Sequence, residues 1–215
     1  MDLRIAWSHE ETTMSRKEDA WIKLSGITGI VAPIVAFTCI LLSTASYPPF
    51  SWTNNALSDL GVKEGITAPL FNGGLMISGI LALIFAAGLL KLLNKNNVGK
   101  IGVLVFALAA LALITIGIFR ENAKPMHYYA SVGFFVFFLI AMLVIAGSSL
   151  YAKSVKTGLF TLIVAIIAAA PWAIEFSVRF VPDVAIPEAI SAVAASVWSI
   201  ALGITMLNKT SQSHG

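Results

Sequence analysis

Charged residues are the first thing that this sequence lacks. Only 12% of its 215 residues are Asp, Glu, Lys or Arg, and its mean hydropathy is +0.87. A soluble domain averages roughly 25% charged residues, because its surface must face water. Long stretches of this chain carry no charge at all. We therefore expect lipid, rather than water, to surround most of the chain.

Cysteine and histidine are also scarce, and their scarcity excludes several kinds of site. The one cysteine, Cys39, lies in an apolar run, so no disulfide can form within the chain. Of the 3 histidines, only His127 lies outside the terminal tails. A zinc hydrolase needs three or more ligands, so we expect neither a metal nor another cofactor. The small net charge of +3 is dispersed, which argues against a nucleic-acid partner.

Six apolar runs account for most of the remaining sequence. Each is close to the ~20 residues that cross ~30 Å of hydrocarbon as a helix. None alternates polar and apolar residues as a barrel strand does. The runs cover residues 24–42, 69–90, 101–119, 126–150, 158–176 and 187–207. The sequence therefore predicts an all-α fold, an integral membrane six-helix bundle, in a multi-pass protein of the cell membrane.

The distribution of Lys and Arg predicts the orientation of this bundle. Most of the 14 basic residues would fall on one side of the membrane, which is typical of the cytoplasmic side. The exceptions are Lys63, Arg120, Lys124 and Arg179. Both termini are therefore predicted to be cytoplasmic. Residues 1–22 would form a polar tail, residues 23–207 the six-helix domain, and residues 208–215 a second tail.

Three prolines and one loop predict where helices begin on the other, extracytoplasmic side. Pro69, Pro125 and Pro187 stand at the start of the second, fourth and sixth runs. Proline is favoured at the first helical position, where its missing N–H costs no hydrogen bond. In the loop before the second run, Thr53 is expected to cap a short helix over residues 54–60. Gly61 would end that helix in a left-handed conformation.

Polar residues at the extracytoplasmic helix ends are the candidate binding residues. They are Asp59, Asn72, Arg120, His127, Glu175, Arg179 and Glu188. Ionisable residues at the membrane edge are candidates for function by default, and we expect the acidic, imidazole and amide groups to converge at one vestibule. Purely structural roles remain open, because Glu188 fits the dipole of its helix and Asp59 can bond to nearby N–H groups.

Glu175 and Arg179 form a separate feature near the end of the fifth run. They are four residues apart in the favoured acid-then-base order, so they would share a helical face. An ion pair there would either fasten the helix end or take part in binding.

Several short motifs resemble one known family. Residues 57–61 (LSDLG), followed by residues 71–74 (FNGG), resemble the domain-of-unknown-function 998 (DUF998) family of six-span membrane proteins from archaea and bacteria. His127 with its Phe-rich helix, and Pro187 with Glu188, are also similar to that family. The resemblance covers roughly residues 23–207 and implies a six-span fold without an agreed activity. The layout is similar to the eukaryotic six-span autophagy-modulator and glycosyl-phosphatidylinositol-remodelling family, whose members are tied to lipid organisation.

Functions from different classes remain open at this point. The first is binding or handling of a membrane lipid or other amphiphile without catalysis, with Arg120 and Arg179 able to meet a lipid phosphate. The second is a membrane-embedded hydrolase or transferase on a lipid-linked substrate, with Asp59 or Glu188 as base and His127 as its partner. The third is a structural subunit that packs against another membrane protein or a second copy of this chain.

Overall fold

The part of the chain that the structure describes is folded almost entirely into helices. This computed structural model describes residues 3–93 and 97–212, with side chains described for residues 17–93 and 97–211. The elements, in order, are α1 (Leu3–Ala45), the 3-10 helix η1 (Leu57–Val62), α2 (Thr67–Leu92), α3 (Asn97–Ile118), α4 (Met126–Tyr151), α5 (Val155–Val178) and α6 (Ala185–Gln212).

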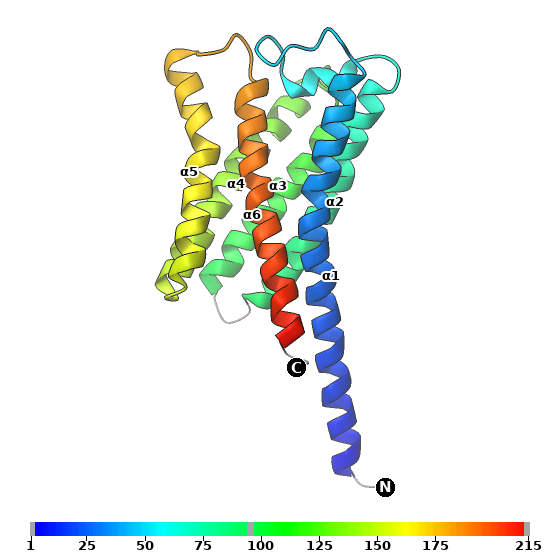
Figure 1. Cartoon of the computed structure of the whole chain (residues 1–215), viewed down its shortest axis with the longest axis vertical. Helices are drawn as coiled ribbons and strands as arrows, with labels where there is room; N and C mark the ends of the chain where they lie inside the picture. The colour runs from blue at the N-terminus through cyan, green and yellow to red at the C-terminus, as the bar shows by residue number, and fades with distance from the viewer. Residues whose placement is uncertain (1–2, 94–96, 213–215) are drawn as a thin grey trace.

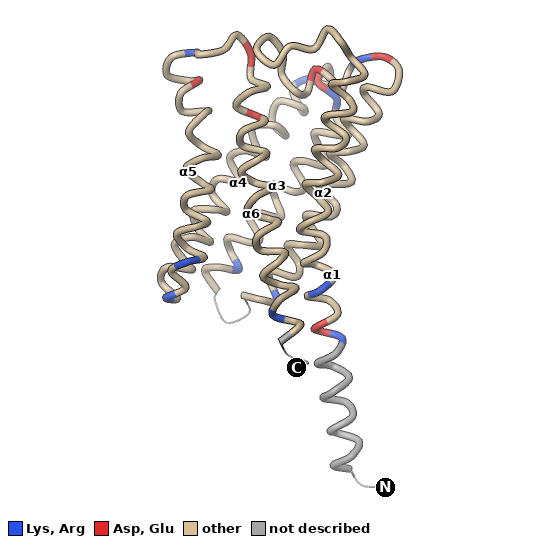
Figure 2. Tube along the Cα trace, viewed as in Figure 1, with Lys and Arg blue, Asp and Glu red and all other residues tan. Residues whose placement is uncertain are grey.

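Each of the six long helices contains a stretch that is long and apolar enough to cross a membrane. These candidate spans are Lys17–Ala45, Thr67–Leu92, Asn97–Ile118, Met126–Tyr151, Val155–Val178 and Ala185–Ser211. Large apolar side chains such as Ile34, Leu104 and Ile166 are more than half exposed on the outside of the bundle, which suits lipid but not water. The described charged residues lie towards its two ends (Figure 2). These observations confirm a helical, multi-pass membrane protein.

The six helices form a closed ring. Each helix packs against its neighbours in the sequence, and α6 closes the ring by packing against α1. Both termini lie at one end of the bundle, and η1 lies at the other (Figure 1). We call these the terminal end and the η1 end. The arrangement agrees with an even number of spans, and the cytoplasmic location of the terminal end stays a prediction.

The centre of the ring is filled by aromatic side chains around Trp198 on α6. Trp198 is fully buried, and its ring centroid lies 5.9 Å from that of Phe85 and 5.3 Å from that of Phe106. Its Nε1–H donates to Thr161 Oγ1 over 3.2 Å, which satisfies the buried indole N–H. Trp198 therefore connects α6 to α2, α3 and α5 and fills the centre of the ring.

Residues 3–22 are helical in the structure. The backbone is helical from Leu3 and continues without a break into the first span, so the expected polar tail is an extension of α1 (Figure 1). No proline or glycine occurs before Gly26 to end such a helix. The change from polar to apolar sequence near residue 22 thus marks a change of surroundings and not of secondary structure.

The prolines do not occupy the helix positions that the sequence predicted. Pro69 and Pro187 are the third residues of α2 and α6, and Pro125 comes immediately before α4. The prediction of the first position was wrong by one or two residues. The physical reason is that the first four N–H groups of a helix have no intrahelical acceptor, so proline is tolerated throughout the first turn.

Candidate functional site

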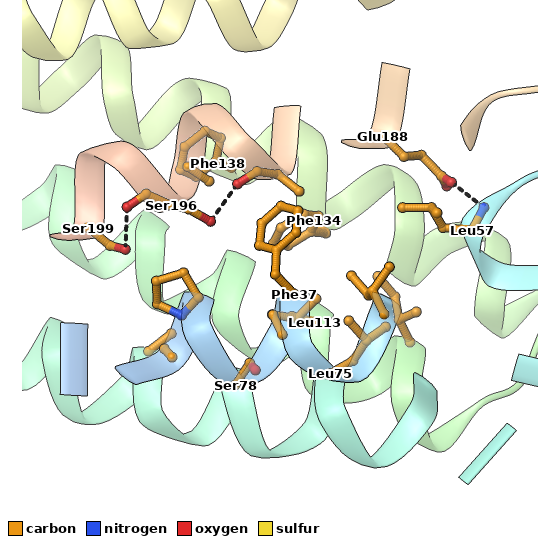
Figure 3. Close-up of a pocket in the computed structure, with 18 of the residues that line it drawn as sticks. Phe37, Leu57, Leu75, Ser78, Leu113, Phe134, Phe138, Glu188, Ser196 and Ser199 are labelled. Carbon is orange, nitrogen blue, oxygen red and sulfur yellow. Dashed lines mark hydrogen bonds between the residues drawn. The ribbon is translucent and has the colours of Figure 1, made fainter. Parts of the chain in front are cut away.

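A narrow cavity of about 150 Å³ lies inside the ring, between α1, α2, α3, α4 and α6. On α1 its lining extends from Gly29 to Ile40, and on α6 from Ser199 to Glu188. A helix rises about 1.5 Å per residue, so each of these stretches covers roughly 16 Å along the bundle. Apolar side chains form most of the wall, and Glu188 lies at the η1 end (Figure 3). The cavity is therefore a mostly apolar slot with a carboxyl group at its η1 end, which we call the mouth of the slot.

The segment η1 covers this mouth, and the side chain of its own residue Asp59 stabilises its first turn. Asp59 Oδ2 accepts hydrogen bonds from the Ala56 N–H over 3.3 Å and from Asn55 Nδ2 over 2.7 Å. This carboxylate therefore stabilises the first turn of η1. It bonds to nearby N–H groups, which is the structural role that the sequence left open for Asp59. The predicted helix bounds were wrong, because η1 begins at Leu57 and Gly61 lies inside it with no left-handed conformation.

Three other parts of the chain hold η1 by side-chain hydrogen bonds. The Leu57 N–H donates to Glu188 Oε2 of α6 over 2.7 Å. The Ser58 hydroxyl donates to Glu121 Oε2, from the α3–α4 loop, over 3.0 Å. Asn72 Nδ2 of α2 donates to the Gly61 carbonyl over 2.8 Å. The sequence LSDLG thus sits at the point where these elements meet, and Leu57 and Ser58 both line the cavity.

His127 is buried at the start of α4 and faces the same loop. Its Nδ1 lies 2.7 Å from the Phe119 carbonyl oxygen, which only accepts hydrogen bonds, so Nδ1 carries a proton. Its Nε2 lies 2.8 Å from Glu121 Oε2, although the carboxylate is off the direction of a ring N–H bond. The contact is an ion pair when His127 is protonated on both nitrogens. His127 therefore lies against Glu121, which in turn accepts the hydrogen bond from Ser58.

The remaining candidates lie away from the cavity. Arg120 and Arg179 are exposed, and neither lines the slot. Glu175 is buried, and its Oε2 accepts from the Val181 N–H over 3.4 Å. Arg179 ends α5 in a left-handed conformation with φ 44°, so it does not continue the helical face of Glu175. Among the described side chains no ion pair joins the two, and the expected pairing was wrong.

Two residues at this site were not singled out from the sequence. Glu121 is not among the candidate binding residues, and Ser58 was considered only as part of the LSDLG motif. The contact between them joins segments 63 positions apart in the chain, so no local pattern signals it. Three of the predicted binding residues contact η1 either directly or through Glu121. They are Asn72, His127 and Glu188.

The site offers hydrogen-bonding groups but no metal centre. No cluster of three His, Cys, Asp or Glu residues suitable for a metal ion occurs among residues 17–93 and 97–211. Carboxyl, hydroxyl and imidazole groups can bind a polar headgroup or exchange protons with it. The apolar slot beside them can hold a hydrocarbon chain.

A comparison with protein families places this geometry in context. Residues 30–205 match the family described as "Protein of unknown function (DUF998)". The chain belongs to the DUF998 family. The matched region includes η1, all the hydrogen bonds that hold η1 and every cavity-lining residue except Gly29, so the candidate site lies almost entirely within the DUF998 domain. No curated protein and no solved structure was found to match the chain.

Proposed function

We propose that this DUF998 protein binds a single-chain amphiphile with an amine headgroup in the slot beneath η1. The observation that carries the proposal is the position of Glu188, whose carboxyl group lines an otherwise apolar cavity inside a membrane bundle. One carboxyl oxygen accepts from Leu57, and no Lys or Arg forms an ion pair with Glu188 within the described residues. An unpaired acidic group in such surroundings favours a cationic partner.

The charges around Glu188 support an amine rather than a phosphate. Asp59, Glu121 and Asp183 are close enough to act electrostatically on Glu188. All three are acidic, so a phosphate at the mouth of the slot would meet like charges. Arg120 and Arg179, the residues expected to bind phosphate, are exposed and outside the cavity lining. The hydroxyl oxygen of Ser58 retains lone pairs that can accept a second hydrogen bond from an ammonium group.

The dimensions of the slot support one hydrocarbon chain. Its length of roughly 16 Å follows from the helical rise of the lining segments. A cavity of about 150 Å³ lined by Leu, Ile and Phe stays dry and takes up small apolar molecules. Between Glu188 at the mouth and Ser199 at the other end of the slot, the apolar wall includes Phe37, Leu75, Leu113 and Phe134 (Figure 3).

A headgroup series tests this function. Dodecylamine, dodecanol and dodecyl phosphate would be added to the purified protein in maltoside detergent, and unfolding would be followed by the fluorescence of Trp198 and the other tryptophans. A ligand at 100 times its Kd stabilises the folded state by about 2.7 kcal/mol, so we expect dodecylamine to raise the Tm by several degrees. Dodecanol should raise it less and dodecyl phosphate least.

Butylamine is the control for the chain, because it has the same headgroup without the hydrocarbon that fills the slot. We expect it to leave the Tm unchanged at the same concentration. A larger effect of dodecyl phosphate than of dodecylamine, or no effect of any long-chain ligand, would refute the proposal.

A second candidate, a lipid ester hydrolase, is favoured by the contact of Ser58 with Glu121. A hydroxyl beside a carboxylate, which is itself held by a third group, is a recurrent arrangement of nucleophile, base and positioning residue. Ser58 Oγ would attack the ester carbonyl carbon while its proton passes to Glu121. The alcohol would leave with that proton, and water would cleave the acyl-serine by the same route, releasing a fatty acid.

This candidate predicts that a fluorophosphonate probe labels Ser58. The expected result is a single phosphonyl adduct in the intact-protein mass spectrum, absent in Ser58→Ala and strongly slowed in Glu121→Gln. Ser51→Ala, which changes a serine in the same loop outside the cavity lining, should be labelled like the unmodified chain. An unlabelled Ser58 in folded protein after prolonged exposure would eliminate the hydrolase.

A further inference from the structure

Ser78, halfway along α2, presents a buried hydroxyl group that lacks a partner. The residue is 2% exposed, it lines the cavity, and its Oγ has no hydrogen-bond partner among the described residues. Figure 3 shows its hydroxyl directed from α2 towards the interior of the slot. A buried polar group without a partner is unfavourable. The position of Ser78 therefore points to a partner that comes from outside the protein.

Two other serines of the same cavity have hydroxyl groups that are already paired. Ser196 Oγ donates to the Ala192 carbonyl over 2.7 Å, and Ser199 Oγ donates to the Ser196 carbonyl over 3.2 Å. Such bonds to the preceding turn are the usual solution for a serine in a helix. Ser25 is the other serine with an unpaired buried hydroxyl, but it does not line the cavity. Among the described residues, Ser78 is thus the cavity-lining serine whose hydroxyl is both fully buried and unpaired.

A second polar feature lies on the neighbouring helix α1. Pro33 is inside this helix and has no N–H to donate to the carbonyl of Gly29, four residues earlier. Both residues line the slot. Ser78 follows Phe71, at the mouth, by a helical distance of roughly 10 Å, and Ser196 follows Glu188 by roughly 12 Å. The slot therefore has polar groups at two levels that are separated by apolar wall.

We propose that the ligand carries a second polar group, a hydroxyl, which bonds to Ser78 about 10 Å below its amine headgroup. The chemical class is an amphiphilic amine with a hydroxyl along or at the end of its chain. This inference rests on the proposed function, because Glu188 fixes the end at which the amine sits. The hydroxyl of such a ligand can donate to Ser78 Oγ or accept from it, whereas a plain alkyl chain leaves it unpaired.

The test compares octylamine and decylamine with their ω-hydroxyl derivatives. Isothermal titration calorimetry would give the Kd of each compound for the purified protein in detergent. One additional hydrogen bond contributes a modest free energy, so the better-fitting hydroxyl derivative should bind about fivefold more tightly than its parent amine. In Ser78→Ala that gain should disappear, while the Kd of the parent amine stays within about twofold.

Ser196→Ala is the matched control, because it removes a hydroxyl of the same cavity that is already bonded within its helix. The fivefold gain should survive in this variant. A gain that persists in Ser78→Ala, or is lost in Ser196→Ala instead, would overturn the assignment to Ser78. If the parent amines bind and the ω-hydroxyl adds nothing, the inference fails while the proposed function stands. If no amine binds, the proposed function itself fails.

Discussion

Gly74→Ala is expected to destabilise the protein strongly, whereas Gly73→Ala is expected to leave it intact or slightly more stable. A Cβ at Gly74 would collide with the Cβ of Cys39, so α2 could not approach α1 as it does. A Cβ at Gly73 would meet nothing within 4 Å. Small residues allow this kind of close helix approach in membrane bundles. The two neighbouring glycines thus differ only in the face of α2 that they occupy.

The expected magnitudes make the pair a sharp test. Overpacking a well-packed interface costs about 1–3 kcal/mol, while alanine in place of a helical glycine contributes up to about 1 kcal/mol in favour of the helix. The Tm values of the two variants in detergent should therefore differ by at least about 4 °C. Equal Tm values would mean that α1 and α2 do not pack at Gly74 as described. The described position of the part of the slot wall that α1 and α2 form would then also be incorrect.

The fold was predictable because the membrane imposes simple rules on the sequence. A chain in lipid must satisfy its backbone within each span, so six apolar runs of sufficient length predict six helices. The structure confirms these helices. Their ends were less predictable, as Pro69 and Pro187 show, because several positions in the first turn tolerate proline. The polar sequence before residue 23 was interpreted as a cytoplasmic tail, and its backbone is helical from Leu3.

The candidate site was predictable only in part, because its geometry depends on contacts between distant segments. Asn72, His127 and Glu188 could be singled out as polar residues at apolar helix ends. Their partners could not, since the Leu57 N–H and Glu188 are 131 positions apart in the chain. The failure of Glu175 and Arg179 to pair has a local cause that the spacing does not reveal, namely the left-handed conformation of Arg179.

The unpaired hydroxyl of Ser78 shows a further limit of sequence reasoning. A serine in an apolar helix usually donates to its own backbone, so its presence in α2 carries no signal. Its meaning depends on the cavity beside it, and the cavity depends on the closure of α6 against α1. The proposed function therefore depends on the space between helices more than on any one motif.

Glu188→Gln should abolish most of the affinity for long-chain amines while leaving the fold intact. Glutamine has nearly the same shape, and its side-chain oxygen can still accept the hydrogen bond from the Leu57 N–H. The variant removes only the acidic group that can pair with an ammonium group in the slot. A hydrogen bond to a charged group contributes about 1.5–3 kcal/mol, so the Kd for dodecylamine should rise by at least about tenfold. The Kd for dodecanol should change by less than about threefold.

Two further variants separate the loss of charge from the loss of structure. Glu188→Ala removes the acceptor of the Leu57 N–H as well, which should lower the free energy of unfolding by about 1–3 kcal/mol and loosen η1. Glu64→Gln removes an exposed acidic residue at the same end of the bundle and should change neither the Tm nor the Kd. If Glu188→Gln binds dodecylamine as tightly as the unmodified chain, the amine does not sit at Glu188. The proposed orientation of the ligand would then be untenable, because Glu188 is the ionisable group among the cavity-lining residues.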